Sequence, residues 1–183
     1  MKQDRVKASL QKFADGVVLQ AKANLARENK NVTGNLTQSI DYDLEVGPNS
    51  FFLRWKMDDT APYWKFQDLG VQGKSSSTKA PNSPFRFGTG SSGMRGGLTR
   101  AINEWVKKRR FQFRDEKGRF MSYDNTAFLI TRSVYNKGIR TTNFFTNPFR
   151  LQFQQLPQEI ASAFALDLKD FLQFTLQPKP PKE

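Results

Sequence analysis

An apolar stripe near the start of the chain is the feature that most restricts its fold. The spacing of the apolar residues, at steps of three and four, is that of one face of an α-helix. Lys, Arg and Gln occupy the other face. An exposed stripe of this length is unfavourable in water, so the helix needs an apolar partner. The stripe consists of Val6, Leu10, Phe13, Val17, Ala21 and Leu25.

A second long helix is predicted at the other end of the chain. It begins at the Thr-Asn-Pro of residues 146–148 and runs to about Leu176, with a kink where Pro157 interrupts it. Residues 177–183, QPKPPKE, cannot continue a helix and are predicted to be a disordered tail. We expect the apolar side chains of this helix to pack in the core: Leu156, Ile160, Phe164, Leu168, Phe171 and Leu172.

Strict alternation of apolar and polar residues predicts a β-hairpin between these helices. The turn is GPNS, residues 47–50, and one face of the hairpin is buried. The other face carries Asp41, Asp43 and Glu45, which favours a solvated strand face over an acid/base pair, although an acidic strand could meet a basic neighbour across a subunit interface. The buried face comprises Ile40, Tyr42, Leu44, Val46, Phe51, Leu53, Trp55 and Met57.

Shorter elements complete the prediction. Thr33 caps a short helix after the tight turn that Gly34 allows, and a second short helix covers Ala61 to Leu69, with Pro62 in its first turn and Gly70 after its end. A helix restarts at about Gly97, with Leu98, Ile102, Trp105 and Val106 facing inward.

A second hairpin is predicted on the turn Asp115 to Gly118. Ser122 or Asp124 then caps a helix that Gly138 ends. This helix carries the apolar set Ala127, Phe128, Ile130, Thr131, Val134 and Tyr135.

Together these elements predict an α+β fold, with antiparallel β-hairpins packed on long N- and C-terminal helices. A chain of 183 residues with 37% apolar residues can bury one sizeable core, so we expect a single domain over residues 1–176. Residues 70–96 are rich in Gly, Ser, Thr and Pro, and this segment is longer than a simple connecting loop in a compact domain. They predict an extended, flexible, basic arm that is either disordered or functional.

The net charge of +12 implies an acidic partner or an acidic neighbour. Residues 70–120 hold 12 basic and 3 acidic side chains, whereas the flanking regions are nearly neutral. This distribution suggests either a directed basic surface or a solvated loop. The run Lys107 to Arg110 also closes the predicted helix, where cations favour the helix dipole without any ligand.

The residue types exclude several kinds of chemistry. The chain has no Cys and no His, so it has no disulfide, Cys/His zinc site, thiol nucleophile or Ser-His-Asp triad. GTGSSG, residues 88–93, matches GxGxxG but has no flanking strand and helix, so we interpret it as a loop. We therefore expect no catalysis, no cofactor and no metal. The charged N-terminus predicts a soluble protein made in the cytoplasm, without a membrane segment.

Five stretches in order resemble the neck or tail-completion proteins of tailed bacteriophages, including those of crAss-like phages. They read ARENKNVTGNLTQSI, APYWKFQDLGVQG, APNSPFRFG, RDEKGRF and FLITRSVYNKGIRTTNFFTNPF, and they span roughly residues 20–150. Their order and spacing carry the resemblance. RGGL at residues 95–98 departs from the Pro-containing helix start of that family.

The resemblance implies a non-catalytic virion protein, a subunit of a ring of six or twelve copies between the portal and the tail. Its partners would be copies of itself, other neck, portal and tail proteins, and double-stranded DNA in the channel, bound without sequence preference. Loops of such proteins reach neighbouring subunits, and here these contact residues would be Lys74, Lys79, Phe85, Arg86, Phe87, Phe144 and Phe145.

Contact with DNA is expected from the basic stretch, and it would be independent of sequence and sensitive to salt. The alternative is a free, sequence-nonspecific nucleic-acid-binding protein, in which Phe111, Phe113 and Phe120 stack on unpaired bases. The same aromatics are explained equally by a hairpin that packs on the body. The candidate DNA contacts are Arg95, Arg100, Lys107, Lys108, Arg109, Arg110, Arg114, Lys117 and Arg119.

Overall fold

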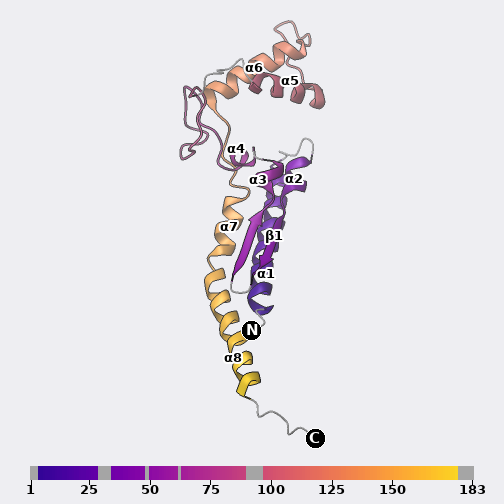
Figure 1. Ribbon diagram of the computed structural model, residues 1–183. Coiled ribbons are helices and arrows are strands. Elements are labelled where there is room, and N and C mark those ends of the chain that lie inside the picture. Colours follow the sequence, from indigo (N-terminus) through magenta and orange to yellow (C-terminus); the bar gives the residue numbers. More distant parts are fainter. Residues whose placement is uncertain (1–3, 29–33, 48–49, 62, 90–96, 177–183) are drawn as a thin grey trace. The chain divides into compact units, whose positions relative to one another are not determined.

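The computed structural model describes residues 4–28, 34–47, 50–61, 63–89 and 97–176 (Figure 1). The fold is α+β, as predicted, with a two-stranded hairpin packed beside long N- and C-terminal helices. Where the sequence predicts a single domain, the contacts gather into two compact units. Unit 1 comprises Met1–Glu28, Thr37–Thr60 and Phe144–Glu183, and unit 2 comprises Asn29–Leu36 and Ala61–Asn143.

The long helix α1 (Asp4–Arg27) forms the centre of unit 1. The predicted stripe is confirmed at five of its six positions, and the sixth, Leu10, is half-buried. The buried residues are Val6, Phe13, Val17, Ala21 and Leu25. Helices α7 (Thr146–Phe153) and α8 (Leu156–Leu176) both pack against α1. The two ends of the chain therefore cover each other's apolar surface, which is the partner that the stripe requires.

The C-terminal segment is two helices, and the single kinked helix predicted from the sequence is wrong. Helix α7 ends at Phe153, and Gln154 and Gln155 form a turn before α8. Pro157 explains the break, because a proline ring in a helix collides with the carbonyl four residues earlier, which here belongs to Phe153. Helix α8 restarts with Pro157 in its first turn, where the missing N–H costs nothing.

The buried face of α8 also differs from the prediction. Phe164, Leu168 and Leu172 are exposed, whereas Ala163 and Asp167 are buried. The small side chain of Ala163 leaves room for α8 to approach α1, and the Asp167 carboxylate accepts hydrogen bonds from Arg5 and from the backbone N–H of Val6. The interhelical contact therefore selects a face of α8 that its hydrophobic pattern does not indicate.

Strands β1 (Tyr42–Val46) and β2 (Phe51–Trp55) form the predicted hairpin, and their antiparallel register places Tyr42 opposite Trp55 and Val46 opposite Phe51. The Trp55 ring lies 6.5 Å from that of Phe13 on α1 and 5.0 Å from that of Phe145, in edge contacts. This confirms that Trp55 packs on the stripe of α1. Edge-to-face aromatic pairs of this kind add to the stabilisation from burial alone.

Three short helices lie, along the sequence, near the points where the chain passes from one unit to the other. Helix α2 (Asn35–Ser39) follows Gly34 as predicted, and its predicted cap, Thr33, lies outside the described residues. Helix α3 (Met57–Thr60) follows the hairpin, and α4 (Trp64–Asp68) begins three residues later than the predicted start at Ala61. Gly70 has a φ of +73°, a left-handed conformation that ends the segment after α4.

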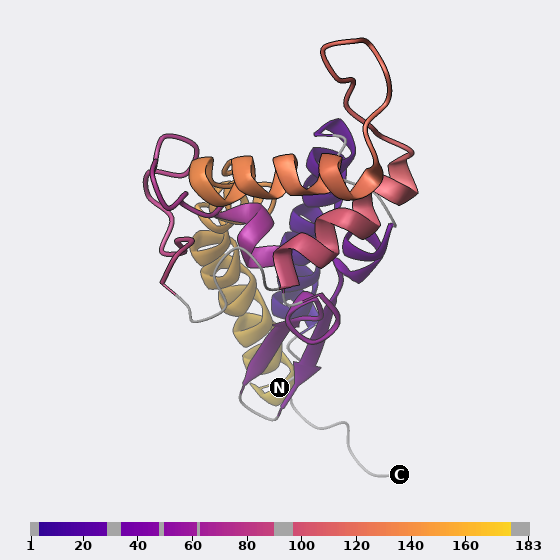
Figure 2. The same ribbon diagram turned by 90° about the horizontal axis from the view of Figure 1, so that it is seen from above.

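In unit 2, α5 (Gly97–Arg109) and α6 (Tyr123–Lys137) lie side by side (Figure 2). Val106 of α5 and Ala127 and Thr131 of α6 are buried. The Ser122 hydroxyl accepts a hydrogen bond from the backbone N–H of Asn125, so Ser122 is the cap of α6 among the two residues that the sequence offers. Trp105, which the sequence places inward, is exposed instead, and Phe128 of the set predicted for α6 is exposed as well.

Residues 70–89 fold onto the C-terminal end of α6 within unit 2, which differs from the extended arm predicted for 70–96. Val71 forms an antiparallel bridge with Ile139, and the backbone N–H of Lys74 donates to the carbonyl of Tyr135 at 2.9 Å. A Cβ at Gly73 would overlap the backbone carbonyl of Asn136, so the close approach requires glycine. The composition of residues 70–96 suggested flexibility because backbone hydrogen bonds to distant residues cannot be inferred from composition. Residues 90–96 lie outside the described residues.

Candidate nucleic-acid interface

The net charge of the chain belongs entirely to unit 2. Its sequence ranges contain 17 basic and 5 acidic side chains, whereas those of unit 1 contain 12 of each. The difference accounts for the whole net charge of +12. A general requirement for solubility would not by itself place the excess charge in one unit, so unit 2 is the candidate for contact with an acidic partner.

The basic run at the end of α5 closes in a left-handed turn. Arg110 has a φ of +51°, and its backbone N–H donates to the carbonyl of Lys107 at 3.2 Å. The N–H of Phe111 donates to the carbonyl of Val106 at 3.0 Å. These two bonds form a Schellman motif, and the Trp105 and Phe111 rings, 6.3 Å apart, supply the apolar contact that accompanies it.

The residue at the left-handed position is unusual. Glycine adopts this conformation without cost, whereas an L-residue other than Asn or Asp adopts it at about 1–2 kcal/mol. Arg110 therefore holds a backbone conformation that costs free energy, while its side chain is exposed. The sequence predicts Arg110 at the end of the helix with the rest of the run, and no local pattern indicates its left-handed conformation.

The loop between α5 and α6 carries the second group of predicted DNA contacts and projects beyond the two helices (Figure 2). Its tip is the predicted turn, in which Gly118 has a φ of +76° and donates its N–H to the carbonyl of Asp115. The Asp115 carboxylate accepts hydrogen bonds from the backbone N–H groups of Lys117 and Arg119 and from Nε of Arg119. An antiparallel bridge between Arg114 and Phe120 joins the two arms of the loop. The backbone N–H of Asp115 also donates to the carbonyl of Arg119, and that of Met121 donates to the carbonyl of Phe113, both at 2.8 Å.

The predicted DNA contacts divide into engaged and free cations. Arg114 lies 4.1 Å from the centroid of the Phe120 ring and donates to the carbonyl of Gly118, and Arg119 pairs with Asp115. These two arginines stabilise the loop. Arg95 lies outside the described residues. In the described part of the chain, these exposed cations have no acidic partner within 4 Å: Arg100, Lys107, Lys108, Arg109, Arg110 and Lys117.

Exposed aromatic rings accompany the free cations. The Trp105, Phe111 and Phe113 rings follow one another, with centroids 6.3 and 5.2 Å apart, and Phe120 is the most exposed of the group. Base–aromatic stacking contributes about 1–3 kcal/mol per base where nucleic acid is single-stranded. The site therefore combines cations for phosphate with apolar rings for bases or for a protein surface.

The residues predicted to contact other subunits have two different environments. Lys74, Lys79 and Arg86 are exposed on unit 2, and Phe85 and Phe87 are half-buried there against Phe66 and Tyr135 respectively. The other two residues are core residues of unit 1, so the prediction for them is wrong. Phe144 and Phe145 are 1% and 6% exposed. The FFTNPF motif contributes to folding, because Phe145 packs edge-on against Trp55.

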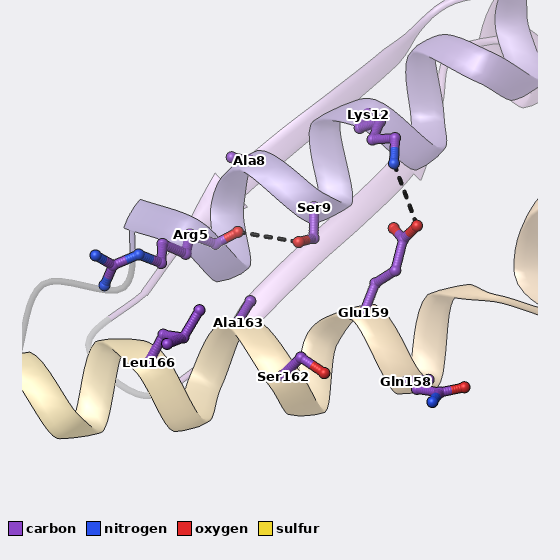
Figure 3. A pocket seen from close by; sticks show the side chains of 9 residues that line it. All are labelled: Arg5, Ala8, Ser9, Lys12, Gln158, Glu159, Ser162, Ala163 and Leu166. Carbon is purple, nitrogen blue, oxygen red and sulfur yellow. Dashed lines mark hydrogen bonds and ion pairs between the residues drawn. The ribbon is translucent and has the colours of Figure 1, made fainter.

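A groove of about 470 Å³ lies between α1 and α8 in unit 1 (Figure 3). Small residues, Ala8, Ser9, Ser162 and Ala163, line it, and the Nζ of Lys12 and Oε1 of Glu159 meet across it at 3.2 Å. The ion pair is exposed, and the lining contains no buried polar side chain directed into the groove. We interpret the groove as the seam of a close helix–helix contact.

The hairpin carries a small cluster of charges. Lys56 Nζ lies 3.0 Å from Asp41 and 3.1 Å from Asp43, and the hydrogen bond to Lys56 lowers the pKa of Asp41. Burial, together with a 2.8 Å hydrogen bond to Asp15, raises the pKa of Tyr42 to about 12. The predicted solvated acidic face is thus partly neutralised within the hairpin. Among the described residues, no three His, Cys, Asp or Glu side chains gather as a metal site.

Compared with known protein families, curated proteins and solved structures, the chain matches none. Within the described ranges, none of the helices has the length and hydropathy needed to cross a lipid bilayer.

Proposed function

We propose that this chain is a structural, non-catalytic subunit of the neck of a tailed bacteriophage, in a ring that joins the portal to the tail around the DNA channel. The ordered series of sequence motifs supports the assignment to the neck. Unit 2 has a net charge of +12 and unit 1 is neutral, which supports DNA contact by unit 2 and subunit contacts by unit 1.

Neutral and basic units suit different tasks in a ring. Unit 1, with its long helices and hairpin, is suited to contacts between subunits, since a neutral surface avoids repulsion between identical copies. Unit 2 presents free cations, which neutralise phosphates without reading the sequence. This property suits a channel through which any DNA passes, and the same cations can meet acidic patches of neighbouring neck proteins.

The second candidate is a free nucleic-acid-binding protein. The exposed rings of Trp105, Phe111, Phe113 and Phe120 beside the free cations favour this candidate for single strands. The two proposals differ in their preferred nucleic acid. A channel protein binds duplex DNA weakly and through phosphates, whereas a stacking protein prefers unpaired bases.

The deciding experiment combines native mass spectrometry with titrations of duplex and single-stranded DNA at several salt concentrations. We expect the chain to form a closed ring, alone or with its portal and tail neighbours, and to bind duplex DNA with a modest salt slope. A monomer under all these conditions, with strong preference for single strands, would contradict the ring and support the alternative.

A test in the phage separates assembly from DNA binding. Interruption of the gene should leave filled heads and free tails that do not join. Replacement of Lys117 with Gln should leave joining intact and change only DNA retention. Normal virions in the absence of the chain would contradict a role in the neck.

A further inference from the structure

Both outer edges of the hairpin have backbone groups without partners. The N–H of Lys56 donates to the carbonyl of Asp41, and the N–H of Gly47 donates to that of Ser50. Since hydrogen-bonded pairs in an antiparallel ladder recur at every second position, Tyr42, Leu44 and Val46 direct their backbone groups away from β2. By the same rule, Phe51, Leu53 and Trp55 direct theirs away from β1, and no outward bond from either set occurs in the described part of the chain.

An open groove of about 580 Å³ follows the edge of β2. It is lined by every residue of the strand, Phe51 to Trp55, and by Glu45 as the sole contribution of β1. Successive side chains of a strand point to opposite faces, so a hollow that touches five residues in a row lies along the strand's edge. Phe52, one of the lining residues, is 62% exposed. Such an edge can accept another strand.

The charges on the exposed face of the hairpin restrict which strand can pair with the edge of β2. On the face of the hairpin opposite Trp55, β1 and the residue before it carry only acidic side chains, those of Asp41, Asp43 and Glu45. On β2 and the residue after it, the outward charges are Arg54 and Lys56. Lys56 pairs with Asp41 and Asp43, which leaves Glu45 and Arg54 exposed and without an ion-pair partner among the described residues. The hairpin therefore has one free negative charge on β1 and one free positive charge on β2.

We propose that the β2 edge of one copy binds the β1 edge of the next copy, so that the sheet continues from subunit to subunit. Pairing of β1 with β1 would place acid against acid, and pairing of β2 with β2 would place Arg54 and Lys56 against cations. Only the head-to-tail pairing alternates acidic and basic strands across the boundary, as within one hairpin. A head-to-tail contact closes into a ring or extends into a filament, so this inference deepens the proposed ring and rests on it.

The free charges also define the register. With Arg54 opposite Glu45 of the next copy, Leu53 lies opposite the next copy's Val46 and Trp55 opposite its Leu44. These residues all direct their backbone groups outward, so the ladder can form, and their apolar side chains share one face of the sheet. Val46, 49% exposed in the isolated chain, would be covered by this contact.

Cysteine cross-linking tests the pairing directly, because the chain has no Cys of its own. In this register Arg54 and Glu45 of the next copy form a non-hydrogen-bonded pair with Cα atoms about 4.5 Å apart, which a disulfide can bridge. The Glu45→Cys and Arg54→Cys proteins are prepared separately, mixed and oxidised. We expect a mixed dimer many times more abundant than either homodimer.

The matched control is Leu19→Cys, on an exposed position of α1, mixed with Arg54→Cys. A mixture of Glu45→Cys and Arg54→Cys with no more dimer than this control would overturn the proposal. Predominance of a Glu45→Cys or Arg54→Cys homodimer would overturn it in favour of two-fold pairing. A strand from another neck protein, cross-linked to Arg54→Cys in preference to Glu45→Cys, would also overturn it.

Charge reversal supplies a second measurement that does not depend on oxidation. Glu45→Arg alone and Arg54→Glu alone place like charges opposite each other, and we expect about tenfold weaker self-association in sedimentation. Mixing the two variants restores opposite charges at every contact and should restore association, and Arg54→Lys should behave as the parent. Failure of the mixture to recover would contradict the pairing.

The outcomes separate this inference from the proposed function. A ring detected by native mass without the Glu45–Arg54 cross-link would overturn the edge contact and leave the ring in place. Cross-linked open filaments with no closed ring would retain the edge contact and contradict the ring.

Discussion

The carboxylate of Asp167, on α8, accepts a hydrogen bond from the backbone N–H of Val6 in the first turn of α1, at 3.4 Å. Arg5 Nη1 donates to the same carboxylate at 3.1 Å, and Asp167 is buried. A carboxylate at this position satisfies a free N–H of the helix start and favours the helix dipole. This bond ties the two ends of the chain together.

Asp167→Ala should therefore lower the free energy of unfolding by about 1–3 kcal/mol, because it leaves a buried N–H without an acceptor. The matched control is Asp170→Ala, which removes the exposed ion pair between Asp170 and Arg5 and should have a smaller effect. Urea unfolding measures both. Equal losses would show that the ion pair, and not the cap, holds the helices.

Arg110→Gly should raise the free energy of unfolding by about 1 kcal/mol, because glycine adopts the left-handed conformation without strain. Asn143 has a similar φ of +50°, but Asn tolerates it, so Asn143→Gly should gain less. If the arginine is retained for binding, the more stable Arg110→Gly variant should bind DNA less tightly. A variant that is more stable and binds equally well would contradict a function for this guanidinium.

Stability should fall at alkaline pH because of Tyr42. Its pKa is about 12 in the folded protein, against 10.0 for an unperturbed tyrosine. Between these values the folded state keeps the proton and the unfolded state loses it, so the free energy of unfolding decreases as pH rises from about 10 towards 12. Tyr42→Phe should flatten this part of the profile, as measured by urea unfolding at a series of pH values. An unchanged slope would assign the loss to other groups.

The cations of the candidate interface should contribute unequally to DNA binding. Lys117→Gln should reduce the salt slope by about 0.9, the value for one phosphate contact, without loss of stability. Arg119→Gln should instead loosen the turn that Asp115 organises. Lys107, Lys108 and Arg109 lie about 100° apart on the helix, so single Gln variants of these residues should differ from one another. Equal losses of DNA retention for all of them, and for Arg110→Gln, with intact assembly would indicate a dedicated DNA grip.

Trp55→Ala should lower the free energy of unfolding by about 3–5 kcal/mol, because the indole contacts the aromatic rings of Phe13, Phe145 and Phe149. Phe52→Ala, on the exposed side of the same strand, should change the stability of the monomer by less than about 0.5 kcal/mol. Thermal melts compare the two. A melting point for Trp55→Ala within a degree or two of the parent would show that the cluster does not stabilise unit 1.

Several features of the fold follow from local sequence patterns. The stripe from Val6 to Leu25, the alternation around the hairpin turn, the Ser122 cap and the left-handed glycines after α4 and α6 were all predicted. In each case the physical requirement is local: a period of 3.6 or 2, a side-chain oxygen near free N–H groups, or a φ that only glycine adopts readily. These patterns determined the elements and most of their ends.

Other features depend on which surfaces meet. Phe164, Leu168 and Leu172 form a convincing helical stripe, but α8 contacts α1 through Ala163 and Asp167, since close approach and the cap on Val6 depend on both helices. The same holds for the candidate nucleic-acid interface. The sequence indicates where its cations lie along the chain, whereas the structure shows that Arg114 and Arg119 are engaged inside the loop and that Lys117 has no acidic partner there. The sequence by itself determined the elements and the number of charges. Only the tertiary structure decided which face of α8 is buried, how the chain divides into two units and which cations are free, because each depends on contacts between residues distant along the chain.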